Sequence, residues 1–324
     1  MVESPSDPRH ETAVREVRAR LAAAGVPSPD VDARWLVDHV VEVVGDPVGC
    51  GAALLDGLVA RRIRREPLQQ VIGRTWFRRL VLACAPGVFI PRPETEIVAG
   101  LAIDAARAAR PTALPSSAED APWPAAGPGT VSSSSAEDAP SRVVRVVEAC
   151  TGTGAIALSI AVEVPDVAVI AADIDPAAVA LATTNLGRVL DGSAGAPMAP
   201  RSTVAVTTSD LMDAIDASWR GHLDVLVANP PYLQAADRGT WEPEVANHDP
   251  DRALVGGEDG HEVVDALLGL AVDWLRPGGT VIVEIDERRG ADALAAATAA
   301  GLSDARIERD LTGADRAVVA TRGA

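Results

Sequence analysis

The sequence predicts an α/β fold in which a mostly parallel, doubly wound sheet follows a small helical domain and a β-hairpin. From residue 142 onward, short apolar, β-branched segments alternate with segments of helical periodicity. Such repeated βα units are typical of a parallel sheet that is covered on both faces. Residues 11–66, in contrast, have helical spacing, and the stretch between these two parts looks extended.

The N-terminal part is expected to hold three helices. The second has clear end signals, because Ser28 followed by proline can cap its start and Gly45 can stop it. The third ends in a run of arginines, which we interpret as a solvated helix end that favours cations, with a partner contact as the alternative. The expected helices cover residues 11–26, 28–45 and 49–66, and the arginines are Arg61, Arg62, Arg64 and Arg65.

The middle of the chain joins two expected domains. Residues 75–93 are apolar, β-branched and broken by Pro86-Gly87, which predicts a β-hairpin linker between a helical domain (1–74) and a larger domain (94–324). A helix is expected at 91–110. Residues 111–141 are rich in Pro, Ser, Ala and Gly and contain SSAEDAP twice, which indicates a disordered insertion without chemistry.

The larger domain is expected to alternate strands and helices after the insertion. Pro277-Gly278-Gly279 is interpreted as a turn, and the last two strands as a closing hairpin. The expected strands are 142–149, 167–173, 202–210, 223–231, 280–286, 305–311 and 316–322, and the expected helices are 154–164, 175–190, 260–275 and 290–302.

Charge and cysteine content narrow the function classes. The net charge is −17, and residues 142–324, which carry the motifs described below, hold 14 arginines against 28 acids. This balance counts against a nucleic-acid substrate, which normally requires a basic face. The three cysteines are far apart and form no CxxC pair, which fits a reducing compartment and no zinc site. Without an apolar signal core or a long apolar run, a soluble, cytoplasmic protein is expected.

Parallel sheets bind ligands at the carboxyl ends of their strands, so three strand ends are of interest. After the first strand, Gly152 and Gly154 allow a tight turn close to a ligand, and the following helix offers free N–H groups. Asp173 ends the second strand, where a carboxylate can accept both hydroxyls of a ribose. After the third strand, Asp210 can meet an adenine amino group and Leu211 one face of its ring.

These three strand ends alone leave the cofactor open. Gly152-x-Gly154-x-x-Ala157 with Asp173 also fits the dinucleotide fingerprint of nicotinamide dehydrogenases. A glycine turn that serves only packing is a further alternative.

The stretch NPPY, residues 229–232, ends the fourth strand and favours methyl transfer to a planar nitrogen. Such a nitrogen is a poor nucleophile because its lone pair is delocalised. The Asn229 side-chain oxygen and the Pro230 carbonyl can accept its two N–H bonds and aim it at a sulfonium methyl group. Pro231 stiffens the backbone, and Tyr232 can stack on the planar group. Adenine N6, guanine N2 and a glutamine amide all remain possible, as does a Pro-Pro turn with no function.

Eight segments, taken in order, resemble the HemK-type protein-(glutamine-N5) methyltransferases. They are PLQQVIGRTWF, GVFIPRPETE, CTGTGAIAL, DIDPAAV, VANPPYL, DPDRALVGGEDG, LRPGGTVIVEI and DLTGADRAVV. The resemblance covers about residues 10–322 apart from the insertion 111–141. It implies a seven-stranded, Rossmann-like class I methyltransferase domain with a small N-terminal helical domain and a β-hairpin linker. It also implies methylation, from S-adenosylmethionine, of the glutamine in the Gly-Gly-Gln motif of peptide chain release factors.

The resemblance also assigns roles to residues of this chain. The loop after the first strand and Asp173 contact the cofactor, with Leu211 beside its adenine. Residues 229–232 bind the glutamine, with Asn229 also near the cofactor, and the helical domain helps to dock the release factor. The catalytic candidates are thus Asn229, Pro230, Pro231 and Tyr232, the cofactor-binding candidates are Cys150, Thr151, Gly152, Thr153, Gly154, Asp173, Asp210, Leu211 and Asn229, and no metal ligand is expected.

Some positions depart from the family pattern. Glu148-Ala149-Cys150 replaces the more usual Asp-Leu-Gly, and Leu211 stands where an aromatic residue is often seen. The segments NHDPDRALVGGEDG and EIDERRG also resemble a related branch whose protein substrate is not established, which leaves the protein that carries the glutamine open. Glutamine methylation of a different protein, amino-methylation of nucleic acid and a non-catalytic cofactor-binding scaffold therefore remain alternatives.

Overall fold

The computed structural model describes residues 8–110 and 142–324, which form two compact units. The first comprises the described residues up to Arg74 together with Cys84–Pro86 and Trp241–His248. The second comprises Thr75–Ala83 and the described parts of Gly87–Thr240 and Asp249–Ala324. The expected insertion at 111–141 lies outside the described residues.

The first unit is helical. Its second helix begins at Pro29, directly after Ser28, but the Ser28 side chain forms no capping hydrogen bond with the described residues of this helix, so that expectation was wrong. The helix ends just before Gly45, whose φ of 85° is the left-handed conformation that glycine adopts readily. Apolar side chains from the first four helices pack into one core, which includes Leu21, Leu36 and Leu58. The helices are α1 (Pro8–Ala23), α2 (Pro29–Val44), α3 (Ala52–Ile63), α4 (Leu68–Ile72) and α8 (Pro243–His248).

The arginines at the end of α3 differ from the expectation of a solvated helix end. Arg62 is buried and forms ion pairs with Asp32 at 2.6 Å and with Glu244 at 2.8 Å. Arg65 pairs with the same Glu244 at 2.6 Å, and Arg61 pairs with Glu66. A guanidinium tolerates burial when carboxylates pair with it. The expectation was wrong for Arg62 because Glu244 belongs to α8, far along the chain.

The second unit contains the predicted seven-stranded sheet, so the α/β fold class is confirmed. Its strand order is β5-β4-β3-β6-β7-β9-β8, with β9 antiparallel to both of its neighbours, as the predicted closing hairpin requires. A separate two-stranded hairpin precedes it. The strands are β1 (Arg74–Phe77), β2 (Leu80–Ala83), β3 (Val144–Ala149), β4 (Val167–Asp173), β5 (Thr203–Thr208), β6 (Leu223–Ala228), β7 (Leu275–Glu284), β8 (Ser303–Arg309) and β9 (Asp315–Thr321).

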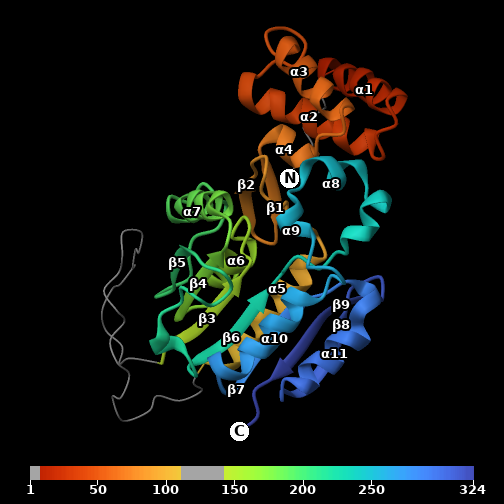
Figure 1. Ribbon diagram of the computed structural model, residues 1–324. Helices are drawn as coiled ribbons and strands as arrows, with labels where there is room; N and C mark the ends of the chain where they lie inside the picture. Colours follow the sequence, from red (N-terminus) through yellow and green to blue (C-terminus); the bar gives the residue numbers. More distant parts are fainter. Residues whose placement is uncertain (1–7, 111–141) are drawn as a thin grey trace. The chain divides into compact units, whose positions relative to one another are not determined.

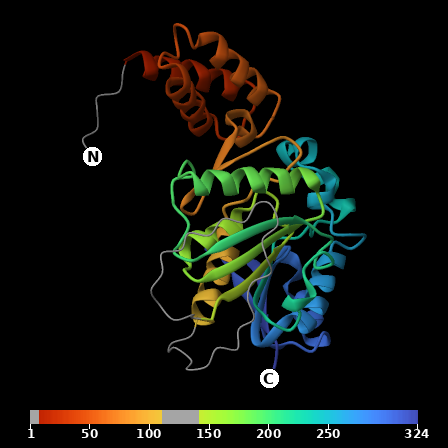
Figure 2. The same cartoon turned by 90° about the vertical axis from the view of Figure 1, so that its left-hand side faces the viewer.

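Helices cover both faces of this sheet (Figures 1 and 2). One apolar core joins the sheet to α5 (Thr95–Ala108), α6 (Ala155–Glu163) and α7 (Pro176–Leu190). The other joins it to α10 (Glu262–Trp274) and α11 (Gly290–Ala299). The short elements are η1 (Ala217–Trp219), η2 (Ala235–Thr240), α9 (Asp251–Leu254) and η3 (Glu287–Arg289). None of the helices within the described ranges is long and apolar enough to span a membrane.

One predicted turn is part of a strand instead. Pro277-Gly278-Gly279 lies inside β7, which pairs with β6 on both sides of it. Leu223 is opposite Leu275, whereas Val225 is opposite Thr280, so the extra residues of β7 form a bulge. Gly278 has a φ of 74° there. A Pro-Gly-Gly segment is thus compatible with a strand that resumes pairing after an irregularity.

Candidate active site

The register of the sheet brings the candidate strand ends together. Ala149, the last residue of β3, lies opposite Ala172 of β4 and Ala228 of β6. The residues that follow these strands therefore leave the sheet side by side, at the same edge. Asp173 at the end of β4 is in turn opposite Thr208 of β5. The four parallel strands thus place the glycine loop, Asp173, the residues after β5 and NPPY at one edge.

The loop between β3 and α6 turns through three residues in the left-handed region. Cys150, Gly152 and Gly154 have φ values of 57°, 55° and 82°. A Cβ at Gly152 would meet no atom within 4 Å, so open space lies beside its backbone. A Cβ at Gly154 would come within 3.3 Å of Ala182, so glycine here permits close packing on α7. Thr151 and Thr153, on either side of Gly152, are buried.

The Glu148 side chain hydrogen-bonds both to this loop and to the helix that follows it. Its side chain is buried, and Oε2 accepts hydrogen bonds from the Thr151 hydroxyl and, at 2.9 Å, from the backbone N–H of Ala157 in the first turn of α6. Burial raises the pKa of this carboxyl to about 8, although both hydrogen bonds act in the opposite direction. Glu148 thereby joins the loop to the start of the helix.

Asp173 lies against the glycine loop. Its Oδ2 accepts from the backbone N–H of Gly152 at 2.8 Å, and its Oδ1 accepts from that of Asp175 at 2.9 Å. These bonds fix the carboxylate between two loops. Burial raises the pKa of this carboxyl, and the two backbone bonds partly offset that rise. Each oxygen keeps a further lone pair for the hydroxyls of a bound ribose.

Asp210 and Leu211 follow β5 at the same edge. The backbone N–H of Ser209 donates to the carbonyl of Asp173 at 2.9 Å, which ties this segment to the end of β4. Asp210 is exposed, whereas Leu211 is half-buried, packs on the core beneath and has a φ of 44°. Burial, together with the carboxylates of Asp173, Glu148 and Asp210, raises the pKa of the Cys150 thiol, so this thiol stays protonated.

These residues fit S-adenosylmethionine. The open space beside Gly152 allows a ligand to approach the backbone, and the fixed carboxylate of Asp173 suits a ribose diol. Leu211 offers an apolar side chain and Asp210 an exposed acceptor for an adenine. Among the described residues no cluster of His, Cys, Asp and Glu able to hold a metal ion is found.

NPPY is held by two residues that the sequence did not reveal as site residues. Asn229 Nδ2 donates to the Thr95 hydroxyl oxygen at 3.1 Å, and the Tyr232 hydroxyl donates to Glu284 Oε1 at 3.0 Å. Pro230 is buried, whereas Asn229 and Tyr232 are half-buried. Because Nδ2 is directed to Thr95, the amide oxygen of Asn229 is the end that remains for a substrate N–H.

Two glycines of the segment ALVGGEDG let a second loop lie directly on NPPY. A Cβ on Gly256 would collide with the carbonyl oxygen of Pro231, and one on Gly260 would come within 2.7 Å of the carbonyl oxygen of Tyr232. Leu233 and Gly256 are joined by a hydrogen bond of 3.0 Å. The glycines are therefore explained by close backbone approach.

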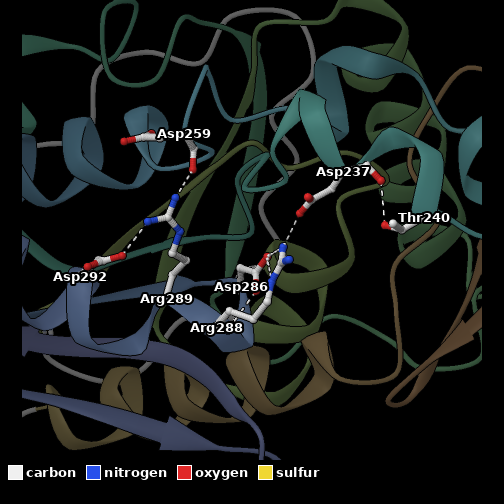
Figure 3. A network of polar contacts seen from close by, with 7 residues as sticks. All are labelled: Asp237, Thr240, Asp259, Asp286, Arg288, Arg289 and Asp292. Carbon is white, nitrogen blue, oxygen red and sulfur yellow. Dashed lines mark hydrogen bonds and ion pairs between the residues drawn. The ribbon is translucent and has the colours of Figure 1, made fainter.

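Two neighbouring arginines after β7, Arg288 and Arg289, bind the segments that follow NPPY in the sequence. Figure 3 shows Arg288 between Asp286 and Asp237, and Arg289 between Asp292 and Asp259. Arg288 bonds the two carboxylates at 2.6 Å and 2.7 Å. Arg289 donates to the carbonyl of Asp259 and pairs with Asp292 at 2.7 Å. The loops around Asp237 and Asp259 are thus tied to the end of β7.

Comparison with known proteins identifies the family. A family model described as "Methyltransferase small domain" matches residues 135–242. The chain is 37% identical to a release factor glutamine methyltransferase of Mycolicibacterium smegmatis over 97% of this chain and 98% of that one. It is 36% identical to a protein of the same name from Streptomyces coelicolor, over 86% and 85% of the two chains. The chain belongs to the release factor glutamine methyltransferase family. It is an enzyme, with S-adenosylmethionine as the methyl donor.

A solved structure described as protein-(glutamine-N5) methyltransferase (release factor-specific), from Alicyclobacillus acidocaldarius, is 19% identical. The match covers 75% of this chain and all of that one, with a TM-score of 0.38.

All the candidate site residues predicted from the sequence lie at or next to the carboxyl ends of the parallel strands. Thr95 and Glu284 were missed because they lie 134 and 52 residues from their partners in NPPY. A signal for Glu284 existed, since it is an acid within the apolar run VIVEI and is almost fully buried. Such a carboxylate needs a partner and so indicates a site or a structural bond.

Proposed function

We propose that this protein methylates the side-chain amide nitrogen of a glutamine, that of the Gly-Gly-Gln motif in a peptide chain release factor. Membership of the family supports the substrate, and one observation of the site supports the chemistry. The bond from Asn229 Nδ2 to Thr95 directs the Asn229 amide oxygen away from Thr95, as an acceptor for a substrate amide N–H.

The site residues act by orienting the amide. In the ground state the nitrogen lone pair is delocalised over the planar amide, so the nitrogen attacks poorly. Asn229 Oδ1 and the Pro230 carbonyl accept its two N–H bonds and hold the lone pair toward the cofactor, which when bound supplies an electrophilic methyl carbon on a positively charged sulfur. Pro230 and Pro231 stiffen the backbone, so these acceptors need little reorganisation.

The reaction requires no general base. As the new carbon–nitrogen bond forms, the bond between the methyl carbon and sulfur would break, and its electron pair would leave on the sulfur of S-adenosylhomocysteine. The nitrogen becomes positively charged and strongly acidic, and its proton then leaves to water. The Pro230 carbonyl and the Asn229 amide oxygen, which accept its N–H bonds, stabilise that developing charge. Tyr232 is then a wall for the planar amide, held in place by Glu284.

The helical unit supplies the docking surface for the release factor in this proposal. Large apolar side chains are exposed around the end of α2 and the start of α3, including Val43, Val48 and Leu54. Exposed apolar side chains of this kind are candidates for a contact with a protein partner. A release factor as substrate would place the enzyme in the cytoplasm.

Mass spectrometry of release factor tests this function. We expect one added methyl group on the Gly-Gly-Gln glutamine after incubation with the protein and S-adenosylmethionine. Replacing Asn229 by alanine removes one of the two oriented acceptors, so we expect the rate to fall about a hundredfold or more. The shift in Tm caused by S-adenosylhomocysteine serves as the control, because a shift that persists in Asn229→Ala shows that the glycine loop and Asp173 still bind the cofactor.

Two results would contradict the proposal. Full turnover by Asn229→Ala would refute the role of the amide oxygen. An unmodified release factor, with S-adenosylhomocysteine still stabilising the protein, would refute the substrate and leave another protein or a nucleic-acid amino group. Methylation of DNA or RNA that weakens steeply with salt would then identify a nucleic-acid enzyme.

A further inference from the structure

A chain of polar groups runs behind NPPY, from Asn229 through Thr95 to Glu284 and back to Tyr232. Asn229 Nδ2 donates to the Thr95 oxygen at 3.1 Å, and the Tyr232 hydroxyl donates to Glu284 Oε1 at 3.0 Å. Glu284 Oε2 is buried and forms no hydrogen bond of good geometry with the described residues, and the Thr95 hydroxyl, which lowers the pKa of this carboxyl, is the donor available to it. Thr95 and Glu284 are 2% and 1% exposed, so neither side chain is aimed at solvent.

The carboxylate fixes the direction of each bond in this chain. An ionised carboxylate only accepts, so the Thr95 and Tyr232 hydroxyls must both donate to it. Thr95 has a single hydroxyl hydrogen, and with that hydrogen directed to Glu284 its oxygen can only accept from Asn229. The amide of Asn229 is therefore held with Nδ2 toward Thr95 and Oδ1 toward the substrate side.

We propose that Thr95 and Glu284 are positioning residues for the glutamine methylation proposed above: together they hold Asn229 Oδ1 as the acceptor that orients the substrate amide. The inference rests on that proposed function. Neither residue touches the reacting atoms, and each acts through a residue of NPPY. Without them the Asn229 amide is free to rotate by half a turn, which presents Nδ2, a donor, to a substrate nitrogen that also carries only donors.

The two substitutions that test this act differently. Thr95→Val keeps the shape of the side chain and removes the hydroxyl, whereas Thr95→Ser keeps the hydroxyl and is the matched control. Glu284→Gln replaces an acceptor-only group by an amide with one donor end. That donor competes for the Thr95 oxygen, so the Thr95 hydrogen can turn to Asn229 Oδ1 and reverse the amide.

The protonation state of Glu284 supplies an independent readout. Burial raises the pKa of this carboxyl to about 7, and the hydrogen bonds from Thr95 and Tyr232 limit the rise. Among the charged groups around it, Arg316 lowers the pKa and Glu94 raises it. Below pH 7 the protonated group no longer dictates the direction of the Thr95 hydroxyl. The rate should therefore rise with pH and level off above about 7.

Single-turnover methylation of release factor, followed by mass spectrometry from pH 6 to 9, tests the inference. We expect Thr95→Val to lose about tenfold to hundredfold in the single-turnover rate constant, the range expected when a buried hydrogen-bonding group is left without its partner. Thr95→Ser should stay within threefold of the wild-type protein. Glu284→Gln should be slow and should lack the inflection near pH 7. S-adenosylhomocysteine should still raise the Tm of all four proteins, since none of these changes replaces a residue of the glycine loop or Asp173.

The outcomes separate the inference from the function on which it rests. If the wild-type protein leaves release factor unmodified, the proposed function itself fails. If the wild-type protein is active and Thr95→Val keeps its single-turnover rate constant within twofold, with only its Tm lowered, Thr95 has a merely structural role and the inference is overturned. The inference is equally overturned if Glu284→Gln keeps the wild-type pH profile, and that comparison decides the matter even where Thr95→Val does not fold.

Discussion

Among the described residues of the glycine loop, Cys150 is the one that adopts a left-handed backbone conformation while carrying a side chain. Its φ of 57° lies in the left-handed region, where a Cβ costs roughly 1 kcal/mol or more. Replacing it by glycine relieves this strain but adds unfolded-state entropy, so we expect a net gain of about 0.5 kcal/mol in the free energy of unfolding. Chemical denaturation measures the change. Cys150→Ala is the control, since it removes the thiol but keeps the Cβ, and an equal gain there would show that strain is not the cause.

The roles of single residues were predictable where they directly follow a strand that the sequence periodicity locates. Gly152, Gly154 and Asp173 follow strands that the periodicity located, so their meeting at one edge followed from the topology of a parallel sheet. Thr95 and Glu284 had no such spacing. Their partners in NPPY are 134 and 52 residues away, and only the packing of α5 and β7 beside β6 brings them there.

At the scale of elements, the loop around Gly256 is expected to control the position of NPPY. A Cβ at Gly256 would collide with the Pro231 carbonyl and come within 2.8 Å of the Gly260 carbonyl. Since both obstacles are backbone atoms, Gly256→Ala must displace one of the two loops. We expect at least a tenfold fall in the methylation rate, because catalysis by orientation is sensitive to small displacements.

A glycine in α10 supplies the matched control for that change. A Cβ at Gly269 meets no atom within 4 Å, and the position is inside a helix. Gly269→Ala should leave the rate unchanged and raise the free energy of unfolding by roughly 0.5–1 kcal/mol. Equal rates for the two variants would show that close contact at Gly256 does not position NPPY.

Element boundaries were predictable wherever a local stop signal coincided with the end of a periodic segment. Gly45 after α2 is such a case, since its left-handed backbone conformation ends the helix without the need for a contact from elsewhere in the chain. The bulge of β7 shows the opposite. Pro277-Gly278-Gly279 carries a turn signal, yet pairing with β6 continues on both sides, because tertiary pairing outweighs the local preference. The helix α8 was missed, since its stabilising partners are Arg62 in α3 and Arg65 just after α3.

On the scale of the whole molecule, the order of helices and strands was enough to predict the fold class, because alternating βα units have few possible arrangements. The division of the chain into two compact units could not be predicted from the order of helices and strands. The segment Trp241–His248 lies after NPPY in sequence but belongs to the helical unit, where Glu244 pairs with Arg62 and Arg65. Long-range ion pairs of this kind leave no periodic signal in either segment.

Charge gives the whole molecule an unusual dependence of stability on pH. Burial raises the pKa of Glu148 to about 8 and that of Glu284 to about 7, so the folded state binds protons that the unfolded chain, with ordinary values near 4.5, releases. Their favourable contribution is complete below about pH 4.5 and is lost as pH rises through 7 and 8. The net charge of −17 acts in the same direction, since self-repulsion grows as these acids ionise.

We therefore expect the free energy of unfolding to fall between pH 5.5 and 8, by roughly 1 kcal/mol per pH unit for Glu148 alone. Urea titrations across that range measure the slope. Glu148→Gln tests its origin, because the amide oxygen can still accept from Thr151 and Ala157 while the titrating proton is gone. The variant should show a flatter dependence and should gain most at pH 8. A wild-type protein that becomes more stable toward pH 8 would contradict the assignment, since it would mean that these carboxyls are held ionised in the fold.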